Sequence, residues 1–376
     1  MVPGTPGSAR ASRPRPLCEL EIQATMHAMV VAKPLRIIIV DDSSLVRQLL
    51  RCGLEAVGGF EIVAEASDGM TAQTVIAQHR PDAVTMDVLM PMRGGLETIR
   101  AILAVQRIPI IVVADPSGGT DALAVEALAA GAVDVFAKPK HGFTEQAAQV
   151  LAGLLRAAVR AHATPSNIAA VAPLAPRAAR SSHRNIACIG IVASTGGPRT
   201  LVQLLEAVKM RTTPIAIVQH TTSGFGPAFA DWLGRTIGRP TPLARAGQVL
   251  RLGDIVVAPD DCHLEIGRGG TLRLEPPTAA ERMFPSGDRL LHSIATTYGI
   301  RGAGIVLTGL GTDGADGLRA IGELGGATAI QTPETAVVSG MPSAAASKCP
   351  LAMIGAIHEL SAWIDQCVTP ADPRPL

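Results

Sequence analysis

The run LRIIIVDD, residues 35–42, decides the fold of the first half of this chain. A short apolar run that ends in charged residues is typical of a buried strand in a parallel sheet. Segments with helical periodicity separate it from further runs of the same kind, which are FEIVAEA (60–66), DAVTM (82–86), IPIIVV (108–113) and AVDVFA (132–137). Strands that alternate with helices predict an α/β domain built on an open, doubly wound, five-stranded parallel sheet.

A second α/β segment begins at Asn185, where the strand-like run NIACIGIVAS opens. A helix is expected from Pro198, because proline is favoured in the first turn of a helix. Further strands are expected at PIAIVQ (214–219), near DIVVAP (254–259) and at GAGIVLT (302–308). These elements predict a second doubly wound α/β domain, which shares no sequence repeat with the first.

The segment between the two halves, residues 163–184, is rich in Pro, Ala and Arg and lacks apolar periodicity, as linkers do. The last helix before it is expected from about Thr144 to His162. Residues 1–33 contain too little apolar surface to form a core. The predicted organisation is a disordered extension (1–33), a first domain (34–150), a linker (151–184) and a second domain (185–370).

The composition argues against several classes of protein. Lys and Arg number 33 against 32 Asp and Glu, so the chain lacks the basic excess that nucleic-acid binding requires. Hydrophobic residues make up 47% of the chain, yet no apolar run approaches the roughly 20 residues of a membrane-spanning helix. Six cysteines without a C-x-x-C pair and an N-terminus without a signal-peptide core predict a soluble cytoplasmic protein with reduced thiols. Met26 and Met29 are alternative translation starts.

Four charged residues follow strands of the first predicted sheet. Asp41 and Asp42 come directly after the first strand, Asp87 after the third and Lys138 after the fifth. The carboxyl ends of parallel strands meet at one edge of a sheet, so these side chains converge there. Clustered carboxylates favour Mg²⁺, and an aspartate beside a cation and a lysine is suited to accept a phosphoryl group. A pair of adjacent acids alone is better explained by a helix N-cap in a solvated loop, and it is Asp87 and Lys138 at the ends of the other strands that reverse this preference.

Residues 35 to 150 resemble a response-regulator receiver domain, which has a flavodoxin-like fold. The resemblance rests on three motifs in the expected order and spacing, VDDSSLVRQ (40–48), MDVLMP (86–91) and KP (138–139). It implies that Asp87 is the phosphorylation site, that Asp41, Asp42 and Asp87 hold Mg²⁺, and that Lys138 contacts the phosphoryl group.

The receiver motifs depart from the family pattern at three places. Ala114 stands where receivers carry Ser or Thr, Val135 where they carry an aromatic residue, and Gly94-Gly95 where they carry Asp-Gly. The hydroxyl and the aromatic ring belong to the switch that reports phosphorylation in that family. We therefore expect phosphoryl acceptance to persist and the response to phosphorylation to be weakened.

In the second half, Ser194, His220 and Asp313 all follow predicted strands. The carboxyl ends of parallel strands share one edge, so the distance between these residues along the chain does not prevent them from meeting. A serine hydroxyl becomes a nucleophile when an imidazole accepts its proton, and a carboxylate orients the imidazole and stabilises its positive charge. The pattern therefore indicates a serine hydrolase.

Each of the three residues also has a purely structural interpretation. Ser194 suits an N-cap or an ordinary strand-to-helix turn, and His220 suits a strand-end histidine with satisfied hydrogen bonds. Asp313 suits a cap of the helix that is expected to start near Asp316.

Glycine-rich turns also bind phosphates or form the elbow of lipases. The turn after Ser194 has no G-x-G-x-x-G pattern and no P-loop lysine, and Arg199 is the only basic residue near it. Val192 occupies the position of the first glycine in the G-x-S-x-G elbow. A nucleotide-binding or phosphate-binding domain is therefore the weaker alternative.

The second half resembles the chemotaxis protein-glutamate methylesterase family, CheB. The resemblance rests on VASTGGP (192–198), QHTTSGF (219–225), FPSGD (284–288) and LTGLGTDGADG (307–317), which occur in the family's order. It implies Ser194 as nucleophile, His220 as general base and acid, and Asp313 as the carboxylate that orients His220. Thr195 and Leu310 are candidates for the backbone donors of the oxyanion hole.

The same resemblance implies the substrates and partners. The substrates would be glutamyl methyl esters and certain glutamine side chains of methyl-accepting chemoreceptors, and the phosphodonor would be a chemotaxis histidine kinase. In that family phosphorylation regulates the esterase and the receiver covers the catalytic cleft, which implies that deletion of the receiver activates the enzyme. Hydrolysis itself would need no cofactor. The alternative is a two-domain signalling regulator that binds a partner without catalysis.

Overall fold

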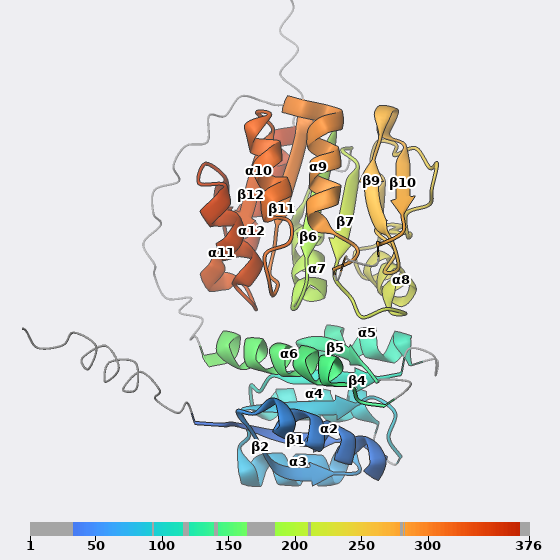
Figure 1. The fold of residues 1–376 in the computed structure, drawn as a ribbon. Helices are drawn as coiled ribbons and strands as arrows, with labels where there is room; N and C mark the ends of the chain where they lie inside the picture. The colour runs from blue at the N-terminus through green and yellow to red at the C-terminus, as the bar shows by residue number, and fades with distance from the viewer. Residues whose placement is uncertain are drawn as a thin grey trace, which may run out of the picture. The chain divides into compact units, whose positions relative to one another are not determined.

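The computed structural model describes residues 33–91, 94–115, 120–138, 142–163, 185–209, 212–278, 281 and 283–368. Residues 1–32 of the predicted extension and residues 164–184 lie outside this part of the chain. The first half forms a parallel sheet with the strand order β2-β1-β3-β4-β5 (Figure 1), which confirms the predicted five-stranded doubly wound fold. Its strands are β1 (Leu35–Val40), β2 (Phe60–Ala66), β3 (Ala83–Asp87), β4 (Ile110–Ala114) and β5 (Asp134–Ala137).

Helices cover both faces of this sheet because its strands are apolar on both sides. One face packs under α2 and α6, with Ile37, Ile39 and Leu151 in its core. The other packs under α3, α4 and α5, with Ile38, Val40 and Ile99 in its core. The helices are α2 (Ser44–Val57), α3 (Gly69–His79), α4 (Gly95–Val105), α5 (Asp121–Ala130) and α6 (Glu145–Ala163).

Helix α6 runs past the domain boundary predicted at residue 150. It continues to Ala163, close to the helix end expected at His162. Leu151, Leu155 and Ala158 are buried on its inner face, and this apolar packing keeps the helix intact well into the predicted linker of residues 151–184. The boundary at 150 was therefore wrong, since residues 151–163 belong to the helix.

The second half forms a six-stranded sheet with the order β13-β12-β11-β6-β7-β8, in which every pairing is parallel. Its strands are β6 (Cys188–Ala193), β7 (Ile215–Gln219), β8 (Ile255–Val257), β11 (Gly302–Val306), β12 (Ala327–Gln331) and β13 (Met353–Gly355). The antiparallel hairpin of β9 (His263–Ile266) and β10 (Leu272–Glu275) was not predicted, and neither were β12 and β13. These strands are short or carry polar residues, so no apolar run marks them.

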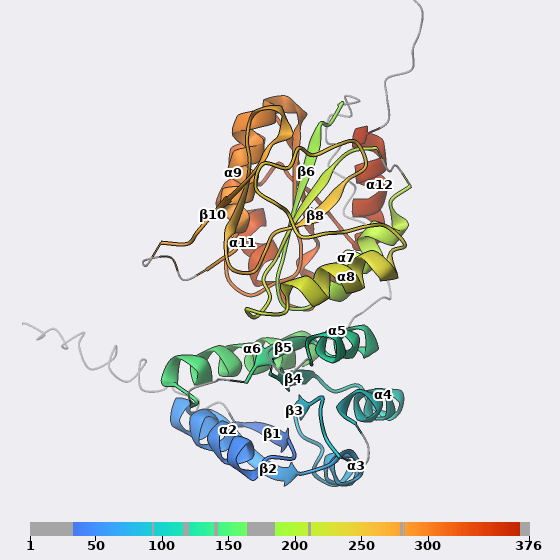
Figure 2. The same cartoon turned by 90° about the vertical axis from the view of Figure 1, so that its right-hand side faces the viewer.

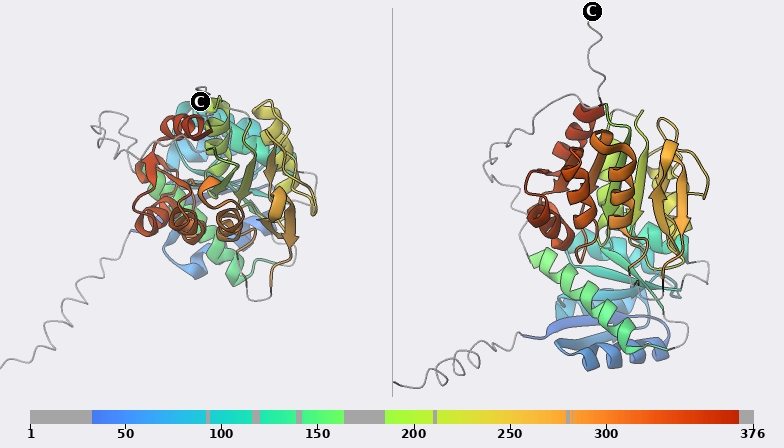
Figure 3. Two further views of the ribbon diagram at one scale, coloured as in Figure 1. Left: turned by 90° about the horizontal axis from the view of Figure 1, so that it is seen from above. Right: turned by 45° about the horizontal axis from the view of Figure 1, so that its top comes forward.

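The second sheet also has helices on both faces (Figures 2 and 3), as expected for the predicted doubly wound domain. Helices α7 (Gly197–Ala207), α8 (Gly226–Thr236) and α12 (Ile357–Val368) pack on one face. Helices α9 (Gly287–Tyr298), α10 (Ala315–Glu323) and α11 (Gly340–Lys348) pack on the other. Short 3₁₀ helices complete the elements at η1 (Arg268–Gly270), η2 (Gly299–Arg301) and η3 (Pro333–Thr335).

Two further expectations concern the whole chain. Among the described residues, no helix is both long and apolar enough to cross a membrane. The cysteines in the described part, Cys52, Cys188, Cys262, Cys349 and Cys367, are all free thiols.

Candidate functional sites

The first site is an acidic cluster at the carboxyl edge of the first sheet. Asp41 and Asp42 follow β1, Asp87 ends β3, and Lys138 follows β5. The Lys138 Nζ lies 2.8 Å from Asp41 Oδ2 and 2.8 Å from Asp87 Oδ2. The structure therefore brings together all four residues that the sequence singled out.

The pKa values of Asp87 and Lys138 in this cluster reflect burial together with the contacts between Lys138 and the aspartates. Burial raises the pKa of Asp87, and the nearby Asp41 raises it further, against the opposing effect of Lys138. Burial lowers the pKa of Lys138, but its contacts with the two aspartates outweigh this and raise it. The ammonium of Lys138 therefore stays charged, held between the carboxyl groups of Asp41 and Asp87.

The cluster fits a small divalent cation. One carboxylate oxygen from each of Asp41, Asp42 and Asp87 lies within 4.8 Å of the other two, so a single ion can reach all three. Mg²⁺ prefers oxygen ligands and is usually held by one or two carboxylates together with water. The donor set and its spacing suit that ion.

The positions that depart from the receiver pattern lie on β4 and β5 and at the start of α4. Ala114 ends β4, is fully buried and offers no hydroxyl, and Val135 is buried in β5. A Cβ at Gly95 would overlap the carbonyl oxygen of Asp87, so only glycine allows α4 to start so close to this residue. Pro139, in the KP motif, lies outside the described residues.

The second site lies at the carboxyl edge of the second sheet. Ser194 directly follows β6, and the neighbouring strands β7 and β11 lead to His220 and to the loop that holds Asp313. The His220 N–H donates to Ala193 O at 2.9 Å, and the Ser194 N–H donates to Thr308 O at 2.9 Å. Three adjacent strands thus deliver the predicted residues to one edge.

The imidazole of His220 contacts the carboxylate of Asp313. Its Nε2 lies 2.9 Å from Asp313 Oδ2, and the side chains are 10% and 12% exposed. The other ring nitrogen, Nδ1, is buried and has no hydrogen-bond partner. Within the described residues, no hydrogen bond joins the Ser194 hydroxyl to the ring. One ring nitrogen of His220 is therefore available as a proton acceptor.

Asp313 is held by the N-terminus of α9. Its carboxylate accepts hydrogen bonds from the Ser286 hydroxyl at 3.1 Å, the Gly287 N–H at 2.5 Å and the Asp288 N–H at 3.0 Å. Burial raises the pKa of Asp313, but the contact with His220 and these backbone donors outweigh it and hold the pKa well below its ordinary value. The carboxylate is therefore ionised at neutral pH.

These contacts test whether Ser194 and Asp313 cap the helices that follow them in sequence. The N-cap of α10 is Gly314, so Asp313 caps α9 rather than the helix that follows it in sequence. The N-cap of α7 is Gly196, so Ser194 does not cap a helix. Arg199 is exposed on α7. Ser194 therefore does not cap α7 and Asp313 does not cap α10, while a strand-to-helix turn does describe the backbone at Ser194, where the Gly197 N–H donates to Ser194 O at 2.7 Å.

Buried polar residues that sequence reasoning missed support this edge. The Gln219 side chain donates to Ser194 O at 2.8 Å and to His220 O at 2.9 Å. The Thr308 hydroxyl donates to Thr195 O at 2.9 Å. Gln219 and Thr308 each follow the apolar run of a strand and precede a site residue. A polar residue at such a position is the sequence feature that could have identified them. They fix the backbone carbonyl groups of Ser194 and Thr195.

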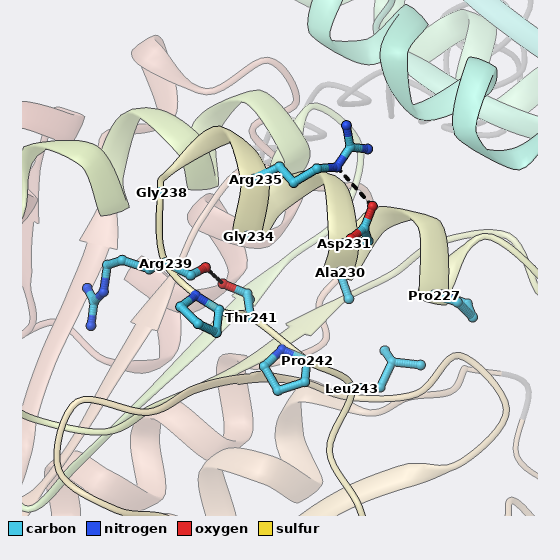
Figure 4. A pocket seen from close by; sticks show the side chains of 11 residues that line it. Pro227, Ala230, Asp231, Gly234, Arg235, Gly238, Arg239, Thr241, Pro242 and Leu243 are labelled. Carbon is cyan, nitrogen blue, oxygen red and sulfur yellow. Dashed lines mark hydrogen bonds and ion pairs between the residues drawn. The ribbon is translucent and has the colours of Figure 1, made fainter.

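A cavity of about 580 Å³ lies apart from the three predicted residues, beside α8 and the segment 238–243 (Figure 4). Asp231 and Arg235 line it and form an ion pair at 2.9 Å. Both side chains are more than half exposed, and such surface pairs contribute little stability. None of the predicted site residues lines this cavity, so the second site is defined by its side-chain geometry.

Two family models match the chain. Residues 37–146 match the response regulator receiver domain, and residues 189–364 match the CheB methylesterase domain. Similar proteins include a protein-glutamate methylesterase/protein-glutamine glutaminase of Hahella chejuensis, 36% identical over 82% of this chain and 91% of the relative. Another from Paramagnetospirillum magneticum is 36% identical over 87% of this chain and 94% of the relative. The CheB methylesterase catalytic domain of Thermotoga maritima has 27% identity, a TM-score of 0.46, and coverage of 48% of this chain and 98% of that domain.

The match to full-length relatives spans both halves of the chain in a single alignment. A relative from Anaeromyxobacter dehalogenans with the same activity in its name is 38% identical over 83% of this chain and 91% of its own length. The sequence-based assignment to this family is confirmed. This chain belongs to the protein-glutamate methylesterase/protein-glutamine glutaminase family, with a response regulator receiver domain preceding a CheB methylesterase domain.

Proposed function

We propose that this chain hydrolyses methyl esters of glutamate side chains on methyl-accepting chemoreceptors and deamidates certain of their glutamines, in the cytoplasm. One observation carries the proposal. His220 and Asp313 are in hydrogen-bond contact at the same sheet edge as Ser194, and a helix N-terminus keeps the carboxylate ionised. A buried hydrogen bond between a histidine and a carboxylate at the same sheet edge as a serine matches the requirements of acyl transfer.

Catalysis follows the order of steps of a serine hydrolase, with an acyl-enzyme intermediate. The ring nitrogen of His220 that does not face Asp313 accepts the proton of the Ser194 hydroxyl as Oγ attacks the ester carbonyl carbon. Asp313 stabilises the imidazolium that forms. The C–O bond to methanol then breaks, His220 returns the proton to the leaving oxygen, and a water molecule hydrolyses the acyl-enzyme by the same steps. An amide substrate releases ammonia instead of methanol.

The oxyanion that develops on the carbonyl oxygen needs backbone donors. The N–H groups of Ser194 and Gly309 already donate to Thr308 O and Val338 O. Gly309 also lies so close to Ser194 that a Cβ on it would be 2.7 Å from the serine Cβ. Thr195 and Leu310, which flank these residues, therefore remain the proposed donors.

The acidic cluster supports phosphorylation of Asp87 by a chemotaxis histidine kinase. Asp41, Asp42 and Asp87 would hold Mg²⁺, which when bound neutralises charge on the transferred phosphoryl oxygens. Asp87 supplies the carboxylate nucleophile, and Lys138, at 2.8 Å, pairs with the charge that the new phosphoryl group brings. This half of the proposal makes the esterase responsive to a kinase signal.

Methanol release from methylated chemoreceptor membranes tests the esterase proposal directly. The purified full-length protein is expected to release methanol from these membranes and ammonia from receptors with unmodified glutamine sites. Receptors with glutamate at every site serve as the control and should release neither. Binding to the membranes without release of either product would favour the alternative, a non-catalytic regulator.

Restoring the missing receiver hydroxyl should strengthen the response to phosphorylation. Ala114→Thr places a hydroxyl at the buried end of β4, beside the acceptor, where receivers normally carry one. The rise in methanol release on adding a small phosphodonor should be about 5-fold larger than in the unmodified protein, a typical size for allosteric coupling. Adding Asp87→Asn should remove the rise in both backgrounds. An equal response with and without the hydroxyl would show that Ala114 does not limit the switch.

A further inference from the structure

A buried histidine outside the three proposed catalytic residues contacts the helix that holds Asp313. His263, the first residue of β9, is fully buried, and its Nδ1 accepts the backbone N–H of Ser286 at 3.0 Å. A backbone N–H can only donate, so Nδ1 must be unprotonated. The proton of the neutral imidazole is therefore on Nε2.

The surroundings of His263 favour this neutral form. Its Nε2 lies 3.4 Å from Glu281 Oε1, and Arg289 pairs with both Glu281, at 3.2 Å, and Glu265, at 2.7 Å. Glu275 stands opposite His263 in the register of β10. Burial lowers the pKa of His263, and Arg289 lowers it further, against the opposing effect of the glutamates. The imidazole is thus an acceptor toward Ser286 at neutral pH.

Ser286 is the residue through which His263 reaches Asp313. It is the N-cap of α9, and its hydroxyl both donates to Asp313 Oδ1 and accepts the Arg289 N–H at 3.3 Å. The next two residues donate their backbone N–H groups to the same carboxylate. A shift of the Ser286 backbone would therefore move every described donor of α9 that holds Asp313.

We propose that His263 is a positioning residue for the hydrolytic reaction. Its neutral imidazole anchors the backbone of Ser286, so that the N-terminus of α9 keeps the Asp313 carboxylate aligned with His220. The proposal rests on the role of Asp313 in the proposed function. It assigns to β9, an element that contributes no side chain to the three catalytic residues, the task of orienting one of them.

Two amide variants separate this role from simple filling of the core. In His263→Asn the side-chain oxygen falls near the position of Nδ1, and in His263→Gln it falls near that of Nε2. The Asn variant should retain most of kcat, whereas the Gln variant should lose about 10-fold to 100-fold in kcat with KM little changed, as expected for a misplaced catalytic group. Thr297→Val is the matched control, because it removes a different hydrogen bond between α9 and β9, at 2.8 Å to Ile266 O, and should leave kcat unchanged.

Proton NMR tests the same positioning role without measuring turnover, through the contact between His220 and Asp313. The proton shared by His220 and Asp313 should give a far-downfield imidazole resonance in proton NMR of the full chain. We expect this resonance in the unmodified protein and the Asn variant, and its loss or shift in the Gln variant. If the unmodified protein hydrolyses no ester, the proposed function fails while the resonance still tests the positioning role.

Equal kcat and an unchanged resonance in the Asn and Gln variants would overturn the proposal. So would a Gln variant whose losses scale only with its unfolded fraction, measured by thermal unfolding. Should the Gln variant fail to fold, His263→Leu takes its place, since it fills a similar volume without an acceptor. Full kcat in a folded Leu variant would then reject the positioning role.

Discussion

Replacing Ser194 by Ala should reduce methanol release from methylated receptors by on the order of 10⁴-fold or more. The Ser194 hydroxyl is the proposed nucleophile at the edge where His220 and Asp313 meet, and the Ala variant keeps the backbone contacts of residue 194 with Thr308 and Gln219. The protein should therefore fold normally. The measurement is methanol release per folded enzyme, with thermal unfolding as the check of folding.

The loss should not grow when His220 is removed as well. Once Ser194 is absent, proton acceptance by the imidazole has nothing to assist, so the Ser194→Ala/His220→Ala double variant should resemble either single variant. Asp313→Asn should be the mildest of the three, because an imperfectly oriented imidazole still accepts a proton. Near-normal turnover of Ser194→Ala would refute the nucleophile assignment. Multiplicative losses in the double variant would mean that the two residues serve separate steps.

Asp87→Asn should abolish phosphoryl labelling of the chain by a histidine kinase or a small phosphodonor. The amide is a poor nucleophile, and it also removes one of the three carboxylates that would hold Mg²⁺. The measurement is incorporation of labelled phosphate with and without a Mg²⁺ chelator. We expect the chelator to suppress labelling of the unmodified protein as well, because the clustered charge disfavours a further anion without a cation.

A matched variant makes this result specific. Asp82→Asn removes a carboxylate of the same domain that accepts the Arg36 N–H at 2.8 Å, away from the cluster, and should label normally. Each site also controls for the other, since Ser194→Ala should label normally and Asp87→Asn should keep its basal hydrolysis. Persistent labelling of Asp87→Asn, or labelling that ignores the chelator, would rule out Asp87 as the acceptor.

Much of the fold could be predicted because buried parallel strands have to be apolar on both faces. Runs such as LRIIIV and CIGIVA differ clearly in composition from loop segments. A chain in which strands alternate with helices can adopt only a few sheet topologies. The hairpin of β9 and β10 escaped prediction, since HLEI and LRLE alternate apolar and charged residues over four positions each. The end of the first domain was also misjudged: the helix was expected to reach His162, but only the packing of Leu155 and Ala158 shows that its second half belongs to this domain.

The sequence by itself determined which chemistry this protein carries. Residue types at strand ends were sufficient to single out Asp87 with Lys138, and Ser194 with His220 and Asp313, because every parallel strand delivers its carboxyl end to one edge. Only the tertiary structure decided how those groups are held. Asp313 is bound by α9 instead of the helix next to it in sequence, and His263 reaches it through Ser286. These contacts join residues from separate elements through hydrogen bonds, whose short range and strict direction leave no periodic trace along the chain.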